Sequence, residues 1–291
     1  MKYRVTHTTA YTYSEAASLS QNELCLVPRG TARQQVISSQ VSFQPQPQYV
    51  HRRIDYFGNI AHVIMIEQPH SALSITASSI VRTGRAQRIE PESSLPWEEV
   101  VQRLRSHPLF DDLEAYQYSF LSPMILINPA IESYARLSFP AGMPVLEGGM
   151  DLMRRIFTEF AYDQSASTVE TPVDQVLANK GGVCQDFAHL AIACFRSLGL
   201  AARYVSGYLE TLPPPGKPKM VGADASHAWL SLYVPDEGWV DLDPTNNVIP
   251  GEMHITVAWG RDYSDVAPVK GVVTGGGMHT LDVEVDVTRM E

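Results

Sequence analysis

A cysteine at the predicted start of a helix is the residue of this sequence that is best placed for nucleophilic chemistry. Cys184 follows Gly181 and Gly182 and precedes apolar residues at helical spacing, namely Phe187, Leu190, Ala191, Cys194, Phe195 and Leu198. First-turn N–H groups and the helix dipole favour a thiolate there. Since Cys184 lies three residues before Phe187, it shares the inward face of the helix. An ordinary buried cysteine is the alternative, and a nucleophile also needs a base and an orienting group.

Two polar side chains on neighbouring predicted strands supply that base and that orienting group. His227 lies opposite the apolar face of a strand over residues 226–234, and Asp243 ends a strand over residues 238–243. A short turn joins the two strands, so we expect them to pair and to bring both side chains together. A neutral imidazole accepts the thiol proton, while a carboxylate holds the ring and stabilises the imidazolium. Asp241 shares the face of Asp243, and geometry alone leaves both carboxylates open.

Each of these residues also has a structural interpretation. His227 can be a partly buried histidine, and Asp243, which precedes Pro244 and Thr245, can form an Asx turn. A metal site made from the same three side chains is a further interpretation. We rank it last, because zinc sites usually draw on several cysteines and histidines. No metal and no cofactor are therefore predicted.

The elements that must hold these residues are helices first and strands afterwards. This order predicts an α+β arrangement with Cys184 at the junction. The proline-rich residues 211–223 between two strands are predicted as a loop able to cover the site. The spacing predicts helices at residues 97–105, 128–137, 145–160, 171–178 and after Cys184, and strands at 201–209, 226–234, 238–243 and 283–287.

The first part of the chain alternates with the period of two that is typical of strands. Residues 1–85 are expected to form an all-β, sandwich-like domain, and residues 86–291 a catalytic core, with the boundary between Arg85 and Pro96. The glycines 275–277 are interpreted as a linker. The predicted strands of the first domain are residues 2–13, 35–43, 49–56, 60–66 and 73–81.

Composition excludes several classes of protein. The chain has 291 residues, a formal charge of −10 and 44% hydrophobic residues, which argues against a general nucleic-acid binder. No apolar run is long enough to cross a membrane, and no signal peptide is recognised at the N-terminus. Three cysteines without a C-x-x-C pair predict no disulfide framework and favour the reducing cytoplasm. The oligomeric state is not determined by these observations.

Three segments carry a resemblance to a known family: GGVCQDFAHL at 181–190, ARYVSGYL at 202–209, and SHAWLSLYVPDEGWVDLDPTNN at 226–247. They resemble the core of the transglutaminase-like superfamily, relatives of the papain-type cysteine hydrolases. RVTHTTAYTYSEAASLSQNELCLVPR at 4–29 and the DYFGN turn at 55–59 resemble the β-domain that precedes this core in a bacterial branch. The resemblance implies Cys184 as nucleophile, His227 as base and, through the D-P-T pattern, Asp243 as orienting residue.

The sequence also departs from the family pattern. Animal transglutaminases have a tryptophan upstream of the cysteine that helps to bind the oxyanion, and the nearest one here, Trp97, is too remote. The Cys184 N–H is expected to supply one oxyanion donor. Tyr162 and Gln164 are candidates for another, and Trp229 for an aromatic wall beside the site. No EF-hand spacing occurs, so no calcium requirement is predicted.

These observations predict a cysteine-dependent hydrolase of peptide-like amide bonds that acts through a Cys184 thioester. Two alternatives stay open. One is acyl transfer to an amine, as in a protein-glutamine transglutaminase. The other is a non-catalytic binding module that keeps the fold, although an intact Cys/His/Asp set argues against it. The expected partner is a peptide or protein amide substrate, with neither nucleic acid nor membrane as a partner.

Overall fold

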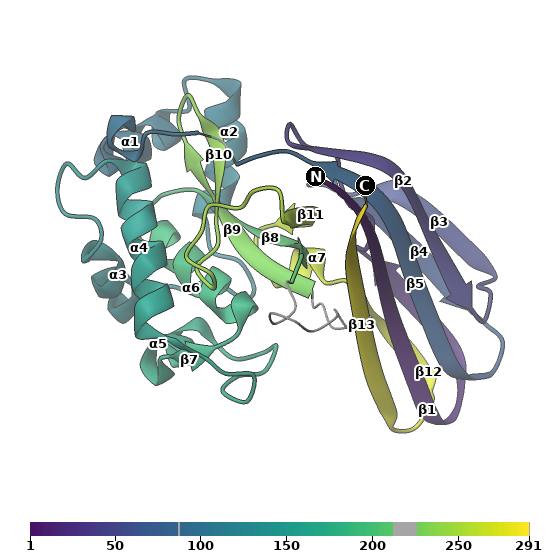
Figure 1. Ribbon diagram of the computed structural model, residues 1–291. Coiled ribbons are helices and arrows are strands. Elements are labelled where there is room, and N and C mark those ends of the chain that lie inside the picture. Colours follow the sequence, from purple (N-terminus) through teal and green to yellow (C-terminus); the bar gives the residue numbers. More distant parts are fainter. Residues whose placement is uncertain (87, 212–225, 291) are drawn as a thin grey trace, which may run out of the picture.

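The protein consists of a helix-rich core and an antiparallel β-sheet region that lie side by side (Figure 1). The computed structural model describes residues 1–86, 88–211 and 226–290. The small core sheet lies between the helices and the strands of the N-terminal region, and the two chain termini lie next to each other (Figure 1). Among the described residues, no helix is long and apolar enough to span a membrane. Most of the loop predicted at residues 211–223 lies outside the described residues.

The N-terminal region is one seven-stranded antiparallel sheet built around its first strand. Strands β4 and β5 pair with successive parts of β1 along one edge, and β12 and β13 pair with successive parts along the other. The strands are β1 (Lys2–Leu24), β2 (Gln34–Gln44), β3 (Tyr49–Ile54), β4 (Ile60–Ile66), β5 (His70–Thr83), β12 (Val269–Gly275) and β13 (His279–Met290).

The pairing between the strands of this sheet is interrupted at about the same position along β1 on both of its edges. The register of β1 shifts between Thr12 and Ala17, next to the breaks between β4 and β5 and between β12 and β13. The glycines 275–277 make one of these breaks, with φ angles of 80°, 83° and 62° that favour glycine. Both halves of the sheet contribute to one apolar cluster, which contains Leu24, Ile64 and Ile66 from one half and Leu73, Ile75 and Ala77 from the other. This shared cluster explains the sandwich-like character predicted from the alternation.

The last strands differ from the sequence-based division of the chain. The sequence pattern places residues 86–291 in the core, whereas β12 and β13 pair with β1 and complete the N-terminal sheet. The glycines predicted as a linker, residues 275–277, lie at the break between β12 and β13. The physical reason is that strand alternation identifies a strand but not its partner, and here the partners lie more than 240 residues apart in the sequence.

The core helices enclose a central helix, α6. Its predicted apolar stripe is buried, but so is every residue from Asp186 to Arg196, because the helix packs on β8 and β9 and against α3, α4 and α5. Buried Arg196 donates hydrogen bonds to the backbone oxygens of Tyr118, Ala202 and Arg261. The helices are α1 (Trp97–Ser106), α2 (Phe110–Tyr116), α3 (Pro129–Arg136), α4 (Val145–Glu159), α5 (Val173–Asn179), α6 (Cys184–Ser197) and α7 (Tyr263–Val266), with 3-10 turns at Pro91–Ser93 and Gln117–Ser119.

The core sheet has four strands in the order β10-β9-β8-β11. They are β8 (Ala202–Leu209), β9 (Ser226–Val234), β10 (Gly238–Leu242) and β11 (His254–Gly260), and a two-residue pair, β6 (Ala161–Tyr162) with β7 (Gly181–Gly182), lies beside α6. The sequence analysis did not predict β11. This strand positions the site described below and forms the edge that meets the N-terminal region.

Two amide side chains of the N-terminal region bind the free edge of β11. The Gln34 amide donates to the carbonyl of Thr256 at 2.6 Å and accepts from its N–H at 2.9 Å. Asn59 makes the same pair of bonds with Trp259, at 2.8 and 3.0 Å. Each amide thus satisfies backbone groups that an edge strand would otherwise leave open. We call this contact between β11 and the N-terminal region the domain seam.

Candidate active site

Cys184 is the first residue of α6, as the sequence predicts, and the local sequence explains why the helix begins there. The Asp186 carboxylate accepts hydrogen bonds from the Val183 N–H at 2.8 Å and from the Ser167 hydroxyl at 2.5 Å. A Cβ on Gly182 would lie 2.6 Å from the same carboxylate oxygen, so only glycine fits before this cap. Cys184 therefore lies in the first turn, where backbone N–H groups lack partners within the helix.

His227 lies near the start of β9, opposite Gly207 of β8, and is only 9% exposed. Its Nε2–H donates to Asp243 Oδ2 at 2.8 Å, which leaves Nδ1 as the ring nitrogen for the Cys184 sulfur. Burial alone lowers the pKa of His227, but hydrogen bonds to Asp243 and Cys184, together with their negative charges, raise it to about 10. An imidazolium at neutral pH beside the sulfur stabilises a thiolate.

Asp243 is fully buried, and its carboxylate accepts five hydrogen bonds. Oδ1 accepts from the N–H groups of Thr245 at 2.9 Å and Asn246 at 3.2 Å, which is the Asx turn that the sequence offers as an alternative. Oδ2 faces His227. Burial raises the pKa of Asp243, but the hydrogen bonds from His227 and His254 outweigh it and hold the pKa well below its usual range. The Asp243 carboxylate thus forms the Asx turn with Oδ1 and the hydrogen bond to His227 with Oδ2.

Asp241, the other carboxylate on this face, lies in different surroundings. It accepts a hydrogen bond from Ser231 at 2.5 Å and an ion pair from Arg33 of the N-terminal region at 3.0 Å. Oδ1 is therefore occupied within the core sheet, and Oδ2 is occupied in the contact between the two regions. Of the two carboxylates that the alternation left open, Asp243 is the one in contact with His227.

The sequence analysis missed two partners of Asp243. His254 Nε2–H donates to Oδ2 at 3.1 Å from the start of β11, and the Asn246 amide donates to the same oxygen at 2.7 Å. Asn246 belongs to the D-P-T-N run, so its closeness follows from the turn. His254 lies in a segment, HITVAW, whose alternation is a usable strand signal. Its place beside Asp243 depends on the pairing of β11 with β8, which no local pattern specifies.

Tyr162 and Gln164, the predicted oxyanion candidates, lie beside the start of α6. Tyr162 pairs with Gly182 in the short parallel ladder of β6 and β7, and its side chain is 55% exposed. Burial, and then the charge of Cys184, raises the pKa of Tyr162, while a hydrogen bond with Gln164 lowers it. Both side chains are thus within reach of the region in front of Cys184.

Trp229 does not line an open wall beside the site. It has no exposed surface, and its ring packs 5.9 Å from that of His227 and 5.3 Å from that of His254, measured between centroids. Its ring lies over Gly207, where a Cβ would come within 2.4 Å. The expected aromatic wall is therefore replaced by a support that holds both histidines. The reason is that His254, which the sequence pattern does not place here, packs against the Trp229 ring from β11.

His227, Asp243 and His254 are also a group that offers metal-ligand chemistry. Their ligand atoms lie within 4.8 Å of one another, and two imidazoles with a carboxylate suit several transition metals. Both Nε2 atoms, however, donate to the same Oδ2. The three groups therefore satisfy one another without an ion between them.

Family models match both regions of the chain. Residues 3–82 match the bacterial transglutaminase-like N-terminal region, and residues 138–244 match the transglutaminase-like superfamily. The second match contains Cys184, His227 and Asp243. The first contains most of the N-terminal sheet, including Gln34 and Asn59 of the domain seam.

Individual relatives extend this similarity over the whole length. An uncharacterized protein of Mycobacterium tuberculosis is 40% identical over 100% of this chain and 93% of its own, and one of Mycobacterium leprae is 35% identical over 99% of each. A protein-glutamine gamma-glutamyltransferase of Pseudomonas aeruginosa is 29% identical over 34% of this chain and 16% of its own. A crystal structure of a candidate cysteine protease from Cytophaga hutchinsonii covers 100% of this chain and 92% of its own, with a TM-score of 0.74 at 20% identity, which is a likeness of fold.

Proposed function

Because the chain belongs to the transglutaminase-like superfamily, we propose that it hydrolyses peptide-like amide bonds through a thioester on Cys184. His227 acts as the acid and base, and Asp243 orients its ring. The observation that carries this proposal is the series of contacts from Asp243 to His227 to the sulfur at the start of α6. The proposed substrate is a peptide or protein, and the cytoplasmic location stays a prediction.

The reaction follows from the charges of these groups. The Cys184 thiolate attacks the amide carbonyl, and the N–H groups at the start of α6 stabilise the oxyanion. The His227 imidazolium gives its Nδ1 proton to the nitrogen of the leaving amine, and the C–N bond breaks. Neutral His227 then takes a proton from water, which attacks the thioester. The C–S bond breaks, and the products are the carboxylic acid and the thiolate beside the imidazolium.

Asp243 contributes by holding His227 in place. A carboxylate fixed by five hydrogen bonds keeps the ring with Nε2 protonated and Nδ1 directed to the sulfur. His254 and Asn246 act through Asp243 and are positioning residues. We propose Tyr162 as the side chain that completes the oxyanion site, since it is exposed beside Cys184 and carries a hydroxyl donor.

Acyl transfer to an amine is the second candidate function. It is favoured by the similarity of 34% of this chain to the protein-glutamine gamma-glutamyltransferase of Pseudomonas aeruginosa. Water at about 55 M competes with any amine, so transfer requires a site that binds the amine and excludes water. Trp97, the nearest upstream tryptophan, is held by a hydrogen bond to the Pro140 carbonyl and does not supply such a wall. We therefore propose hydrolysis as the main reaction.

A panel of peptides with glutamine or asparagine side chains and varied backbones, offered with millimolar primary amine, tests this proposal. We expect free acid as the main product, with one ¹⁸O atom incorporated from labelled water, and an acyl adduct on Cys184 in rapidly quenched samples by mass spectrometry. A dominant amide product at modest amine concentration would assign the protein to the transferases.

The matched controls are two cysteine variants. Cys184→Ala is expected to abolish turnover and adduct formation. Cys25→Ala, in the N-terminal region, is expected to keep both, because Cys25 is buried just after β1 and forms no contact with His227 or Asp243 among the contacts of the described residues. Turnover that survives in Cys184→Ala would exclude the thioester mechanism.

A further inference from the structure

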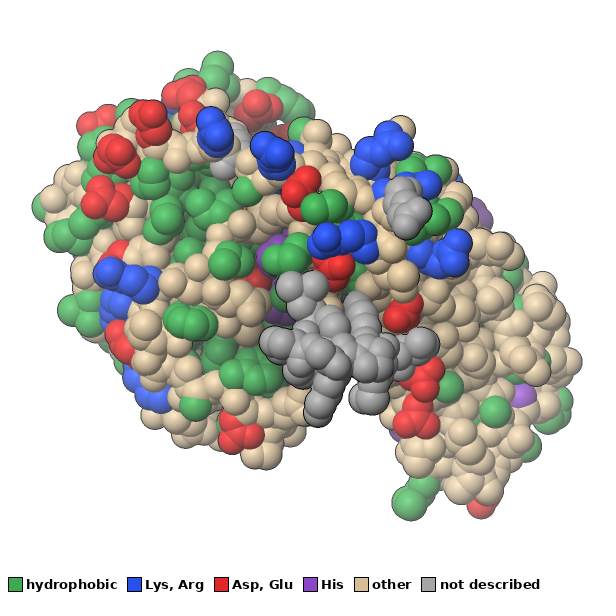
Figure 2. Space-filling model, in the orientation of Figure 1, with side chains coloured by type: hydrophobic (Ala, Val, Ile, Leu, Met, Phe, Trp, Pro, Cys, Tyr) green, Lys and Arg blue, Asp and Glu red, His purple; other side chains and the backbone are tan. Residues whose placement is uncertain are grey.

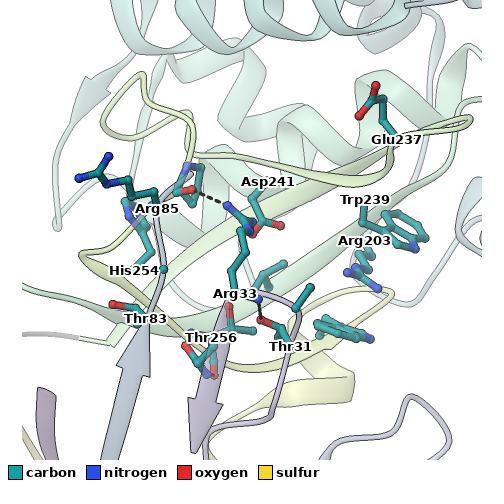
Figure 3. A pocket seen from close by; sticks show the side chains of 17 residues that line it. Thr31, Arg33, Thr83, Arg85, Arg203, Glu237, Trp239, Asp241, His254 and Thr256 are labelled. Atoms are coloured by element: carbon teal, nitrogen blue, oxygen red, sulfur yellow. Dashed lines mark hydrogen bonds and ion pairs between the residues drawn. The ribbon is translucent and has the colours of Figure 1, made fainter. Parts of the chain in front are cut away.

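A pocket of about 650 Å³ lies between the N-terminal region and the exposed face of the core sheet, next to the domain seam (Figure 3). It is lined from one side by Thr31 and Arg33 and from the other by Arg203, Trp239 and Asp241 (Figure 3). This volume is within the range of sites for small molecules. The reaction proposed above does not use it.

The side chain at one end of this pocket is a buried arginine between two indole rings. The Arg203 guanidinium carbon lies 3.7 Å from the ring centroid of Trp259 and 4.2 Å from that of Trp239. Arg29 covers Trp259 as well, with its guanidinium carbon 3.2 Å from the ring centroid. The indoles cover both faces of the Arg203 guanidinium, so its donors are available only along the edge in its own plane.

Those donors have no acceptor among the residues that the structure describes. Arg203 is 8% exposed, its Nε is buried without a hydrogen-bond partner, and it forms no ion pair within residues 1–86, 88–211 and 226–290. Burial lowers the pKa of Arg203 to about 10, which leaves it charged at neutral pH. The charge of Asp241 raises the pKa of Arg203, but no hydrogen bond joins the two side chains within the described residues. A buried guanidinium without an acceptor is costly, and arginine is the residue that most often binds planar oxyanions in pairs of hydrogen bonds.

The neighbouring charges limit which anion fits. Arg33 crosses the middle of the pocket and is occupied by Asp241 at 3.0 Å and by the Pro250 carbonyl at 3.0 Å. This pair is neutral, but its carboxylate disfavours a dianion nearby. Glu237 also lines the pocket. Basic side chains gather on the surface along the upper side of the two regions' contact (Figure 2), which favours the approach of an anion.

We propose that this pocket binds a small molecule or peptide end that carries a single carboxylate, with the edge of the Arg203 guanidinium as its anchor. Two N–H···O bonds from the accessible edge of the guanidinium to the carboxylate supply acceptors that the described residues do not. Trp239 and Trp259 provide apolar surface beside the anchor. His254 lines the opposite end and donates to Asp243, so the ligand lies one side chain away from the candidate active site.

The test measures binding directly and requires no catalytic activity. ¹⁵N-labelled protein is titrated with N-acetylglycine, with its uncharged amide N-acetylglycinamide, and with inorganic phosphate, while the indole N–H signals of the four tryptophans are followed. We expect N-acetylglycine to shift the signals of Trp239 and Trp259 saturably, while Trp97 in α1 stays unmoved. The amide is expected to bind at least ~10-fold more weakly, since it loses a hydrogen-bonded charge.

Two variants locate the anchor. Arg203→Gln is expected to abolish the shifts by N-acetylglycine, and the control Arg82→Gln, on the exposed side of β5, is expected to keep them. If Arg203→Gln does not fold, the comparison of acid and amide on the wild-type protein still decides. Equal binding of acid and amide, shifts confined to other tryptophans, or phosphate binding at least ~10-fold more tightly than the acid would overturn the proposal.

Discussion

Asp243 and Asp241 are two residues apart on one face of the core sheet, yet their carboxylates have different partners. Asp243 lies at the strand end among His227, His254 and the Asn246 amide, next to the start of α6. Asp241 lies in the contact with the N-terminal region, paired with Arg33 and Ser231. One carboxylate holds a titratable ring beside the Cys184 sulfur, and the other forms an ion pair with the N-terminal region.

Asp243 and Asp241 are the same residue type and differ only in the groups that they contact. At the candidate active site, every partner of Asp243 belongs to the core, and the raised pKa of His227 links the carboxylate to Cys184. At the contact between the regions, Asp241 forms an ion pair with Arg33, and the Arg203 Nε has no hydrogen-bond partner among the described residues. The predictions below test whether the candidate active site and the contact between the core and the N-terminal region can be altered separately.

The largest expected effect separates the two carboxylates by rate. Asp243→Asn is expected to lower kcat/KM by at least ~100-fold, because the amide cannot stabilise the imidazolium and favours the wrong tautomer. Asp241→Asn is expected to change the rate little and to lower the free energy of unfolding by about 1 kcal/mol, since its ion pair is partly exposed. The measurements are steady-state kinetics and urea unfolding. A larger rate loss in Asp241→Asn would reverse the assignment of the orienting residue.

The next effect concerns the positioning of Asp243 by His254. His254→Phe removes one charge-assisted hydrogen bond to Oδ2, and we expect about a 10-fold loss in rate. The acid limb of the pH–rate profile is expected to move upward, because Asp243 loses one of the bonds that hold its pKa low. His254→Gln, which keeps a donor, is expected to recover part of both. A profile that keeps its shape in His254→Phe would indicate a purely structural role.

A third prediction concerns stability at alkaline pH. The pKa of His227 is about 10 in the folded protein, above the value of about 6.5 of an unfolded chain. Its stabilising contribution is therefore fully present below about pH 6.5 and is lost as the pH rises through about 10. Thermal unfolding between pH 6 and 10.5 is expected to show a steeper loss in the wild type than in His227→Gln, whereas His51→Gln, on the exposed strand β3, matches the wild type. Parallel curves for wild type and His227→Gln would contradict this.

The last of these predictions concerns the N-terminal region, at acid pH, where no effect on the reaction is expected. His7 of β1 is buried against the Tyr208 hydroxyl and Thr9, and burial lowers its pKa to about 4. Protonation then favours the unfolded chain, so stability falls as the pH drops from about 6.5 to 4, by at most about 3 kcal/mol. His7→Gln is expected to flatten this slope in urea unfolding without changing kcat/KM at neutral pH. An unchanged slope would show that His7 does not carry the effect.

Those parts of the candidate site that depend on local sequence patterns could be predicted from the sequence. The helix start at Cys184 follows from glycines and helical spacing, and the strand of His227 follows from alternation. Alternation alone does not separate Asp241 from Asp243, and the choice of Asp243 came from the D-P-T pattern of the family resemblance. That Asp241 pairs with Arg33 could not be predicted, because Arg33 comes from the N-terminal region. His254 was missed for the same reason, since its position depends on strand pairing. The return of β12 and β13 to β1 is likewise a pairing between distant segments, which the alternation within a strand does not encode.

The reactivity of the three cysteines toward iodoacetamide tests the central claim most directly. Cys25 and Cys194 are buried, and burial raises the pKa of each to about 12, so little thiolate is present at neutral pH. We predict that Cys184 is alkylated at pH 7 at least ~100-fold faster than either, and that His227→Ala slows Cys184 alone, because the imidazolium no longer stabilises its thiolate. Equal labelling of the three cysteines, or an unchanged rate in His227→Ala, would contradict the account of Cys184 as a nucleophile activated by His227.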